Sequence, residues 1–255
     1  MPNSIERIRT IALVGQSGAG KTTLAEALLA AAGATPAAGS VERGTTVCDY
    51  TPLEKQLQHS LKLAVASFEA SDTRIHLLDT PGYSDFLGQA LPALAAVETA
   101  AIVVNAQNGI EMMTGRFMQW AGRRGLDRLV IVNKIDADNV DLEGLLQRIQ
   151  QAFGKECLPL NLPAAGRSKV SDCFFSPSGP ADFSSVEEAH RRLVDQVVEV
   201  DEKLMESYLE KGEVTPEELH GPLERALREG HLIPVLFTSA KSGAGVQDLL
   251  NVIVQ

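Results

Sequence analysis

A glycine-rich segment near the amino end has the residue types and spacing of a phosphate-binding loop. Residues 15–22 read GQSGAGKT, which fits G-x-x-x-x-G-K-[ST]. Glycine lets backbone N–H groups turn inward around a phosphate, and the helix that follows adds its positive end. In this pattern the lysine reaches the β- and γ-phosphates and the hydroxyl binds Mg²⁺. The segment predicts a site for a nucleoside triphosphate with Mg²⁺, formed by Gly15, Gln16, Ser17, Gly18, Ala19, Gly20, Lys21, Thr22 and Thr23.

A second candidate segment, Asp79-Thr80-Pro81-Gly82, follows an apolar run. An acidic residue at the end of a buried strand lies at the carboxyl edge of an α/β sheet, where ligands bind. We expect Asp79 to hold Mg²⁺ through water and the Gly82 N–H to face the γ-phosphate. A loop held by the γ-phosphate can rearrange when that group is lost. Gly82 and Lys21 are therefore candidates for a catalytic role.

The segment Asn133-Lys134-Ile135-Asp136 has the chemistry to select guanine. A buried carboxylate at Asp136 can accept hydrogen bonds from guanine N1 and N2. Adenine offers no such pair of donors, so the carboxylate would be left unpaired, which gives strong discrimination. Asn133 and Lys134 are expected to hold neighbouring loops and to flank the base.

A fourth segment, Thr238-Ser239-Ala240-Lys241, follows the last apolar run. Its backbone can supply an N–H to guanine O6, most simply from Ala240, while Lys241 covers the ring and Ser239 shapes the loop. Such a tetrapeptide is common by itself. Together with the other three segments, in this order, it predicts binding of GTP and GDP.

Short apolar runs rich in Val and Ile alternate with helix-like segments, and such runs are typical of strands buried on both faces. The alternation predicts an α/β fold with a doubly wound, mostly parallel sheet, as in P-loop NTPases of the Ras-like type. A mobile loop is expected at 34–59. The expected strands are 8–14, 61–69, 73–78, 100–104, 129–132 and 232–237, with a turn at Ser71-Asp72, and the expected helices are 22–32, 86–97, 113–124, 140–153 and 246–254.

One segment does not show this alternation of strands and helices. Residues 155–230 contain proline-bearing loops and two charged helical segments, 187–211 and 216–228. We interpret them as an inserted α-rich subdomain, with the main domain formed by 1–154 and 231–255. Its charged helices are most simply solvated faces, and binding of a partner is the alternative.

Composition narrows the classes of partner. The formal net charge of -10 opposes coating of a bare polyanion such as RNA. No apolar run reaches the length needed to cross a bilayer, and no membrane partner is expected. The three cysteines, Cys48, Cys157 and Cys173, include no C-x-x-C pair, which indicates free thiols in a reducing cytoplasm.

The four segments, with Asp79 running on into Asp85-Phe86, resemble the GTPase domain of elongation factor G over the whole chain. That family reads DTPGHVDF where this chain reads DTPGYSDF. Residues 155–230 are similar to the family's G′ subdomain, and 204–209, LMESYL, matches its LMEKYL stretch. The resemblance implies a piece of a larger factor that acts on the ribosome, a monomer, and contact of the insertion with a ribosomal stalk protein.

Two departures from the family concern its chemistry. Tyr83 stands where the family has its catalytic histidine, which positions the attacking water. Tyrosine can donate or accept a hydrogen bond but cannot become a cation, so we expect slow hydrolysis or another water-positioning group. Gly18 replaces a phosphate-loop aspartate that helps hold a monovalent cation in relatives, which removes that support.

A third departure concerns the first switch, where the family has an RGIT motif whose threonine binds Mg²⁺. Residues 43–46 read RGTT but lie too early, whereas counting back from the expected strand at Leu61 gives 57–60, LQHS. Ser60 is therefore the favoured Mg²⁺ ligand and Thr46 the alternative, with His59 interpreted as a loop residue. These departures suggest an elongation factor G-like paralogue.

Three functions remain open from the sequence. The first is a ribosome-stimulated GTPase of translation, which we favour because Lys21, Thr22, Asp79 and Gly82 are retained. The second is a binding module that distinguishes GTP from GDP but hydrolyses little because of Tyr83. The third is a related GTPase serving ribosome release or protection.

Overall fold

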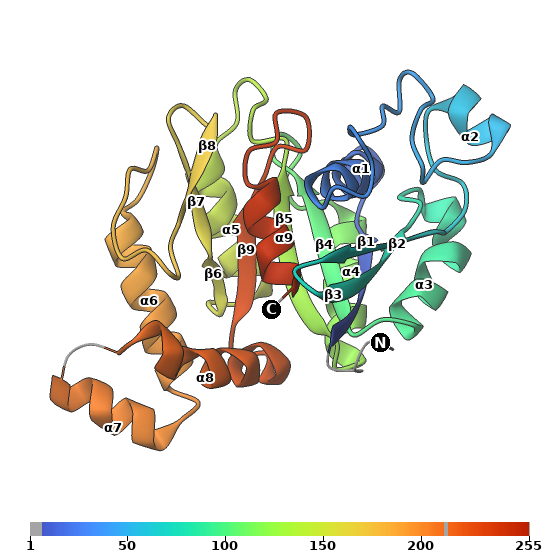
Figure 1. The fold of residues 1–255 in the computed structure, drawn as a ribbon. Coiled ribbons are helices and arrows are strands. Elements are labelled where there is room, and N and C mark those ends of the chain that lie inside the picture. Colours follow the sequence, from blue (N-terminus) through green and yellow to red (C-terminus); the bar gives the residue numbers. More distant parts are fainter. Residues whose placement is uncertain (1–6, 212–213, 255) are drawn as a thin grey trace.

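A seven-stranded, mostly parallel sheet forms the centre of the fold (Figure 1). The structure is a computed structural model that describes residues 7–211 and 214–254. The strand order is β2-β3-β1-β4-β5-β9-β6, with β2 antiparallel to β3 and the other neighbours parallel. The strands are β1 (Ile8–Val14), β2 (Ala64–Ala70), β3 (Thr73–Asp79), β4 (Thr99–Asn105), β5 (Asp127–Asn133), β6 (Cys157–Pro159) and β9 (Ile233–Phe237).

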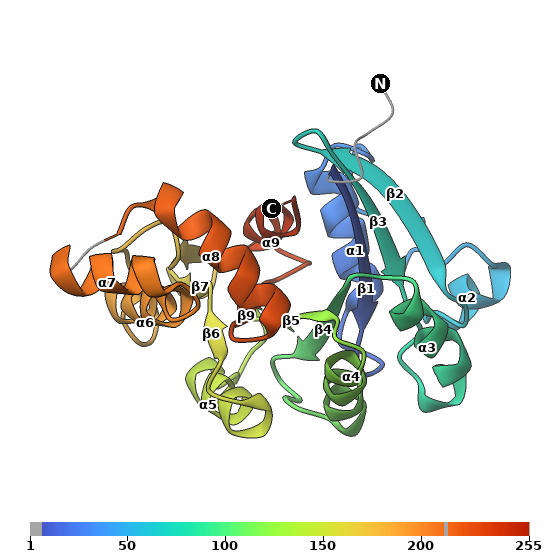
Figure 2. The same ribbon diagram turned by 90° about the horizontal axis from the view of Figure 1, so that it is seen from below.

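Helices cover both faces of this sheet, which confirms the doubly wound α/β class (Figure 2). On one face lie α1 (Lys21–Ala31) and α9 (Val246–Val254). On the other lie α3 (Leu87–Ala95), α4 (Met112–Arg123) and α5 (Leu142–Phe153), with the short 3-10 helix η2 (Ser84–Phe86) before α3. Among the described residues, every helix is too short or too polar to cross a membrane.

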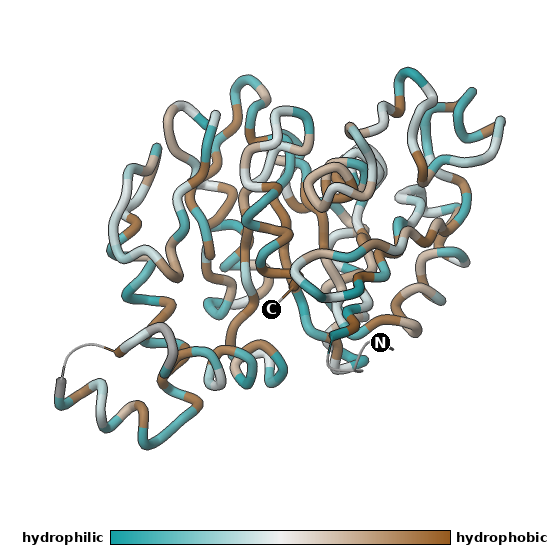
Figure 3. Tube along the Cα trace, in the orientation of Figure 1, coloured by the Kyte–Doolittle hydropathy of each residue, from teal (hydrophilic) through white to brown (hydrophobic). Residues whose placement is uncertain are grey.

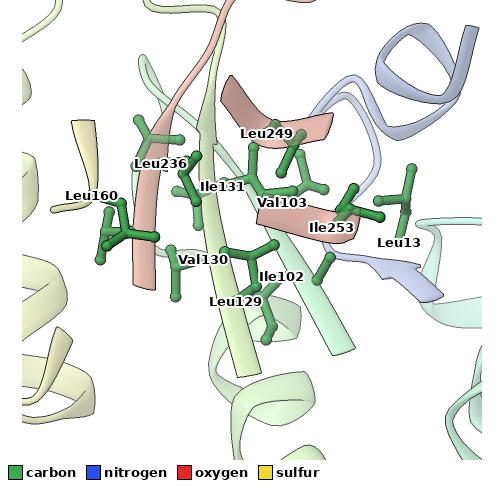
Figure 4. Packing of buried hydrophobic residues seen from close by; sticks show 14 of the residues in the cluster. Leu13, Ile102, Val103, Leu129, Val130, Ile131, Leu160, Leu236, Leu249 and Ile253 are labelled. Carbon is green, nitrogen blue, oxygen red and sulfur yellow. The ribbon is translucent and has the colours of Figure 1, made fainter. Parts of the chain in front are cut away.

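The hydrophobic core fills the space between the central strands and these helices. Val103 of β4 and Ile131 of β5 face Leu249 and Ile253 of α9 (Figure 4). The central strands are apolar along their length, whereas the outer helices alternate between polar and apolar residues (Figure 3). Each buried Leu or Ile of this kind contributes about 1.5–3 kcal/mol. The core therefore holds the strand ends rigidly, and with them the loops that carry the four motifs.

The hairpin predicted at the amino-terminal side of the sheet is confirmed. β2 and β3 pair in antiparallel register from Ala64 opposite Asp79 to Ala70 opposite Thr73. Ser71 and Asp72 form the turn, with φ angles of 47° and 61°. Positive φ at both central residues matches the right-handed twist of the flanking strands.

The segment expected to be one mobile loop contains a helix, α2 (Pro52–Leu57). Thr51 caps it: its side chain accepts from the Glu54 N–H, and the Glu54 side chain accepts from the Thr51 N–H. Pro52 suits the first helical position because its missing N–H would have no partner there. The Thr-x-x-Glu pattern after a turn is a sequence signal that could have predicted this helix.

The boundary of the insertion differs from the expected one. β6 falls within 155–230 but pairs in parallel with β9, from Cys157 opposite Ile233 to Pro159 opposite Val235. Three residues, the last of them a proline, carry too little periodicity to distinguish a strand from a loop. The part that stands apart from the main sheet therefore starts after β6, with a separate hairpin of β7 (Asn161–Ala164) and β8 (Lys169–Asp172).

Three helices complete the insertion and gather at one end of the sheet (Figure 1). They are α6 (Val186–Val198), α7 (Glu202–Lys211) and α8 (Pro216–Glu229). The single helix expected at 187–211 is wrong. Asp201 starts a second helix there, because its carboxylate accepts the N–H groups of Lys203 and Leu204, both at 3.1 Å.

Candidate nucleotide-binding site

A pocket of about 820 Å³ opens at the carboxyl edge of the sheet and brings all four motifs together. The loops after β1, β5 and β9 meet at this edge (Figure 1). The predicted residues on its wall are Ser17, Gly18, Gly20, Lys21, Thr22, Thr23, Ser60, Gly82, Tyr83, Asn133, Lys134, Asp136, Ala240 and Lys241. Gly15, Gln16, Ala19, Asp79 and Ser239 lie next to these residues in the same loops and strand ends.

The phosphate loop is closely packed against the end of β5. Gly20 adopts a φ of 90°, and a side chain added there would lie 2.5 Å from Asn133 Nδ2. Asn133 Nδ2 donates to the carbonyl of Ala19 at 3.0 Å. A glycine is therefore required at position 20 both by the backbone angle and by the lack of space.

Lys21 is buried at the base of this loop, with 6% of its surface exposed. Its Nζ donates to the carbonyls of Gly15 and Gln16, both at 3.0 Å. Burial lowers the pKa of Lys21 to about 8, although the nearby carboxylates of Asp79 and Glu111 oppose that shift. The negative charge of a phosphate would favour the ammonium form again.

The DTPG segment closes directly on the phosphate loop. The Ser17 N–H donates to the carbonyl of Gly82 at 3.0 Å. In this arrangement the Gly82 carbonyl faces the phosphate loop and occupies the Ser17 N–H. That N–H can meet a phosphate only if it shares or exchanges this bond.

Hard oxygen donors cluster where a Mg²⁺ ion is expected. Thr22 Oγ1 donates to Asp79 Oδ2 at 2.6 Å and lies 3.0 Å from Ser60 Oγ. Asp79 Oδ1 is buried and has no hydrogen-bond partner in the described structure. Burial raises the pKa of Asp79 to about 7, with the Thr22 hydrogen bond and Lys21 opposing. Two hydroxyls and a carboxylate with an unused oxygen suit Mg²⁺, which prefers oxygen ligands and would hold the carboxylate ionised.

The two candidate switch residues occupy different places. Ser60 Oγ contacts Thr22 and donates to Asp49 Oδ1 at 2.7 Å. Thr46 is buried, and its hydroxyl has no partner within the described part of the chain. The geometry favours Ser60 as the ligand of Mg²⁺, and that assignment stays a prediction.

Buried carboxylates that sequence reasoning missed shape the first switch. Glu26 is fully buried on α1 and accepts the backbone N–H groups of Val47 at 2.7 Å, Cys48 at 3.1 Å and Gly39 at 3.2 Å. Glu54 is also fully buried, and one of its oxygens accepts from the N–H groups of residues 61 and 62, both at 3.0 Å. Hydrogen bonds to an ionised acceptor are strong, so these two side chains fix the loop.

The end of β5 joins the phosphate loop to the loop after β9. Asn133 is 1% exposed, and its Oδ1 accepts the N–H of Ala240 at 3.0 Å and the hydroxyl of Thr238 at 3.4 Å. The Ala240 N–H that we expected to meet guanine O6 is thus engaged within the protein. It can reach a base only if it shares or exchanges that bond.

The expectation of a buried carboxylate at Asp136 is wrong for this structure, because its side chain is exposed on the wall of the pocket. Lys134 takes a left-handed φ of 65° at the start of the same turn, and the N–H of Ala137 donates to its carbonyl at 3.1 Å. Since Asp136 is exposed in this structure, a bound base itself would have to supply the burial that makes discrimination strong.

The rings of Tyr83 and His59 are in contact on the wall of the pocket. Tyr83 is 46% exposed, and its ring lies edge-on to that of His59 with centroids 4.9 Å apart. His59 Nδ1 lies 2.9 Å from the carbonyl of Leu57 and must carry the proton, since a carbonyl cannot donate. In the neutral ring Nε2 is then an acceptor, and both rings lie on the pocket wall.

Comparison with known proteins agrees with this geometry. The family model "Elongation factor Tu GTP binding domain" matches residues 6–255. An elongation factor G-like protein of Mycobacterium tuberculosis is 36% identical over 96% of this chain, and tetracycline resistance protein TetW of Butyrivibrio fibrisolvens is 30% identical over 97%. This chain covers 36% of each of those proteins. A crystal structure of a Thermus thermophilus protein superposes with a TM-score of 0.88 and 37% identity, over 98% of this chain and 40% of that one.

Proposed function

Because the chain belongs to the elongation factor Tu GTP-binding domain family, as a GTPase domain of the elongation factor G type, we propose that it uses Mg²⁺ to bind and hydrolyse GTP on the ribosome. The observation that carries the proposal is the convergence of four motifs on one pocket. Lys21 would neutralise the β- and γ-phosphates, and Thr22, Ser60 and Asp79 would hold Mg²⁺. Positioning and charge stabilisation supply most of the catalysis in this chemistry.

Guanine selection is tested through Asp136, the residue at which the base would be recognised. We expect Asp136→Ala to weaken GTP and GDP binding by about 100-fold or more, as loss of a charged hydrogen-bonding partner does. Glu143→Ala, at an exposed position on α5, is the control and should bind as the unmodified protein does. Equal GTP affinity in Asp136→Ala would refute the guanine assignment.

Hydrolysis is tested by measuring single-turnover GTP cleavage with and without ribosomes, in the full-length protein and its Tyr83→His variant. We propose that hydrolysis is slow without the ribosome, because a tyrosine offers a weaker water-positioning group than histidine. Strong ribosomal stimulation of the unmodified protein supports a working translational GTPase. No stimulation in either protein would contradict a ribosomal role.

A second candidate is a GTP-dependent binding module that hydrolyses little. The exposed Tyr83, whose ring packs against that of His59, favours it. It predicts no hydrolysis in the unmodified protein and recovery in Tyr83→His. A related GTPase that serves ribosome release or protection stays the third candidate.

The proposed role also implies a cellular location, an oligomeric state and binding partners. We propose that the protein is a cytoplasmic monomer without a membrane partner, and that residues 155–230 form a G′-like subdomain apart from β6. On α7, Leu209 is 76% exposed and Met205 38% exposed. These apolar side chains support contact of the insertion with a ribosomal stalk protein, which a pull-down with a Leu209→Glu variant would test.

A further inference from the structure

The turn between β7 and β8 reaches back to the loop that carries Asp136. Although the hairpin belongs to the insertion, its turn lies at the same end of the molecule as the loops after β5 and β9 (Figure 1). Arg167 in this turn donates from Nη1 to the carbonyl of Ala137 at 2.7 Å. Ala137 directly follows Asp136, so the contact is made on the backbone next to the proposed base-binding carboxylate.

The turn is held in an unusual backbone conformation. Ala165, Gly166 and Arg167 all have positive φ, at 53°, 66° and 69°. Such angles are costly for residues other than glycine and persist where the surroundings hold them. Of residues 165–168, Arg167 is the one that is partly buried. The conformation therefore directs Arg167 toward the base loop while its neighbours face solvent.

A carboxylate from the next loop fixes this conformation. Asp182 Oδ1 accepts the N–H of Gly166 at 3.0 Å, and its Oδ2 accepts the N–H of Arg167 at 2.7 Å. The Asp182 N–H in turn donates to the carbonyl of Pro163 on β7 at 2.7 Å. A continuous set of bonds thus connects the hairpin, through Asp182 and Arg167, to the carbonyl after Asp136.

We propose that Arg167 is a positioning residue for the guanine base, so that the inserted hairpin controls how long the nucleotide stays bound. The inference rests on the proposed binding of guanine at Asp136. A guanidinium bonded to the Ala137 carbonyl restrains the turn from Lys134 to Ala137 and thereby the direction of the Asp136 carboxylate. Displacement of the hairpin would release that restraint and speed nucleotide dissociation.

The test measures dissociation of fluorescent GDP and of a slowly hydrolysed fluorescent GTP analogue from the full-length protein. Arg167→Ala should speed dissociation of both about tenfold, because the base is common to both and one charge-assisted bond is lost. Asp182→Asn should act in the same direction, by about threefold, since one acceptor oxygen remains. Lys169→Ala, exposed on the same hairpin, should leave both rates unchanged.

A double-mutant cycle distinguishes positioning from general stability. If Arg167 acts through Asp136, Arg167→Ala should have little further effect in an Asp136→Ala background, whereas independent effects would add. Arg167→Lys, which keeps one cationic donor, should restore at least part of the slow dissociation. Additive effects, or an Arg167→Ala rate equal to that of the unmodified protein, would overturn the inference. Failure of the unmodified protein to bind guanine nucleotides would instead overturn the proposed function.

Discussion

Asn133 is the residue whose loss should disturb the candidate site most. Its side chain, at the end of β5, bonds to the phosphate loop with Nδ2 and to the loop after β9 with Oδ1. Replacement by alanine removes two bonds of 3.0 Å, each contributing about 1 kcal/mol net. It also leaves the Ala240 N–H unpaired, which costs about 1–3 kcal/mol more. We therefore expect the free energy of unfolding to fall by about 3–5 kcal/mol.

Urea unfolding followed by circular dichroism measures this loss, and fluorescent GDP binding measures the effect on the pocket. Asn133→Asp keeps the acceptor for Ala240 but places a carboxylate oxygen near the carbonyls of Ala19 and Gly20, so it should destabilise at least as much. Asn108→Ala, at an exposed position in the loop after β4, is the control. A loss below about 1 kcal/mol in Asn133→Ala would refute the reasoning, because even one buried bond of this kind exceeds that value when its partner is left unpaired.

Three other perturbations probe the switch and the thiols. Glu26→Gln should speed amide hydrogen exchange at Gly39 by about 10- to 100-fold, because the one amide oxygen can keep the bonds from Val47 and Cys48, which share one carboxylate oxygen, but leaves Gly39 without an acceptor. Glu42→Gln, at an exposed position in the same loop as Gly39, should leave that exchange unchanged, and equal exchange in the two variants would contradict the role of Glu26 in holding the loop. If Nε2 of His59 helps to orient the attacking water, His59→Ala should slow single-turnover hydrolysis about tenfold and leave the affinity for GTP unchanged. An unchanged rate would show that another group orients this water. Burial raises the pKa of Cys157 and Cys173 to about 12, so little thiolate is present at pH 8. A disulfide reagent should therefore label these thiols only as urea unfolds the protein, and fast labelling of the native protein would refute this.

The placement of the motifs could be predicted from the sequence because it depends on local pattern and on one topological rule. Apolar runs mark the parallel strands, and the segments that follow them must meet at one edge of the sheet. Asp79, Asn133 and Ala240 are brought together in this way. The turn at Ser71-Asp72 could be predicted for a similar reason, since short polar residues there tolerate positive φ.

What could not be predicted depends on contacts between distant residues. The course of the first switch is set by the buried carboxylates of Glu26 and Glu54. A sequence pattern can indicate Glu54 as part of a helix cap, but it cannot show that either side chain is buried. β6 is too short to show a period, and its pairing with β9 is what makes it a strand. The exposure of Asp136 likewise depends on which side chains reach it, not on its motif.

The position of β9 has a consequence for the order of folding. β9 lies between β5 and β6, so the edge of β5 stays unpaired until Ile233–Phe237 has been synthesised, although β5 ends at Asn133. Chains grow at about 5–20 residues per second, which leaves this apolar edge open for several seconds. An unpaired edge of this kind recruits other strands. The nascent chain should therefore be most prone to aggregation while its insertion is being made, and chaperones that cover strand edges should matter most in that interval.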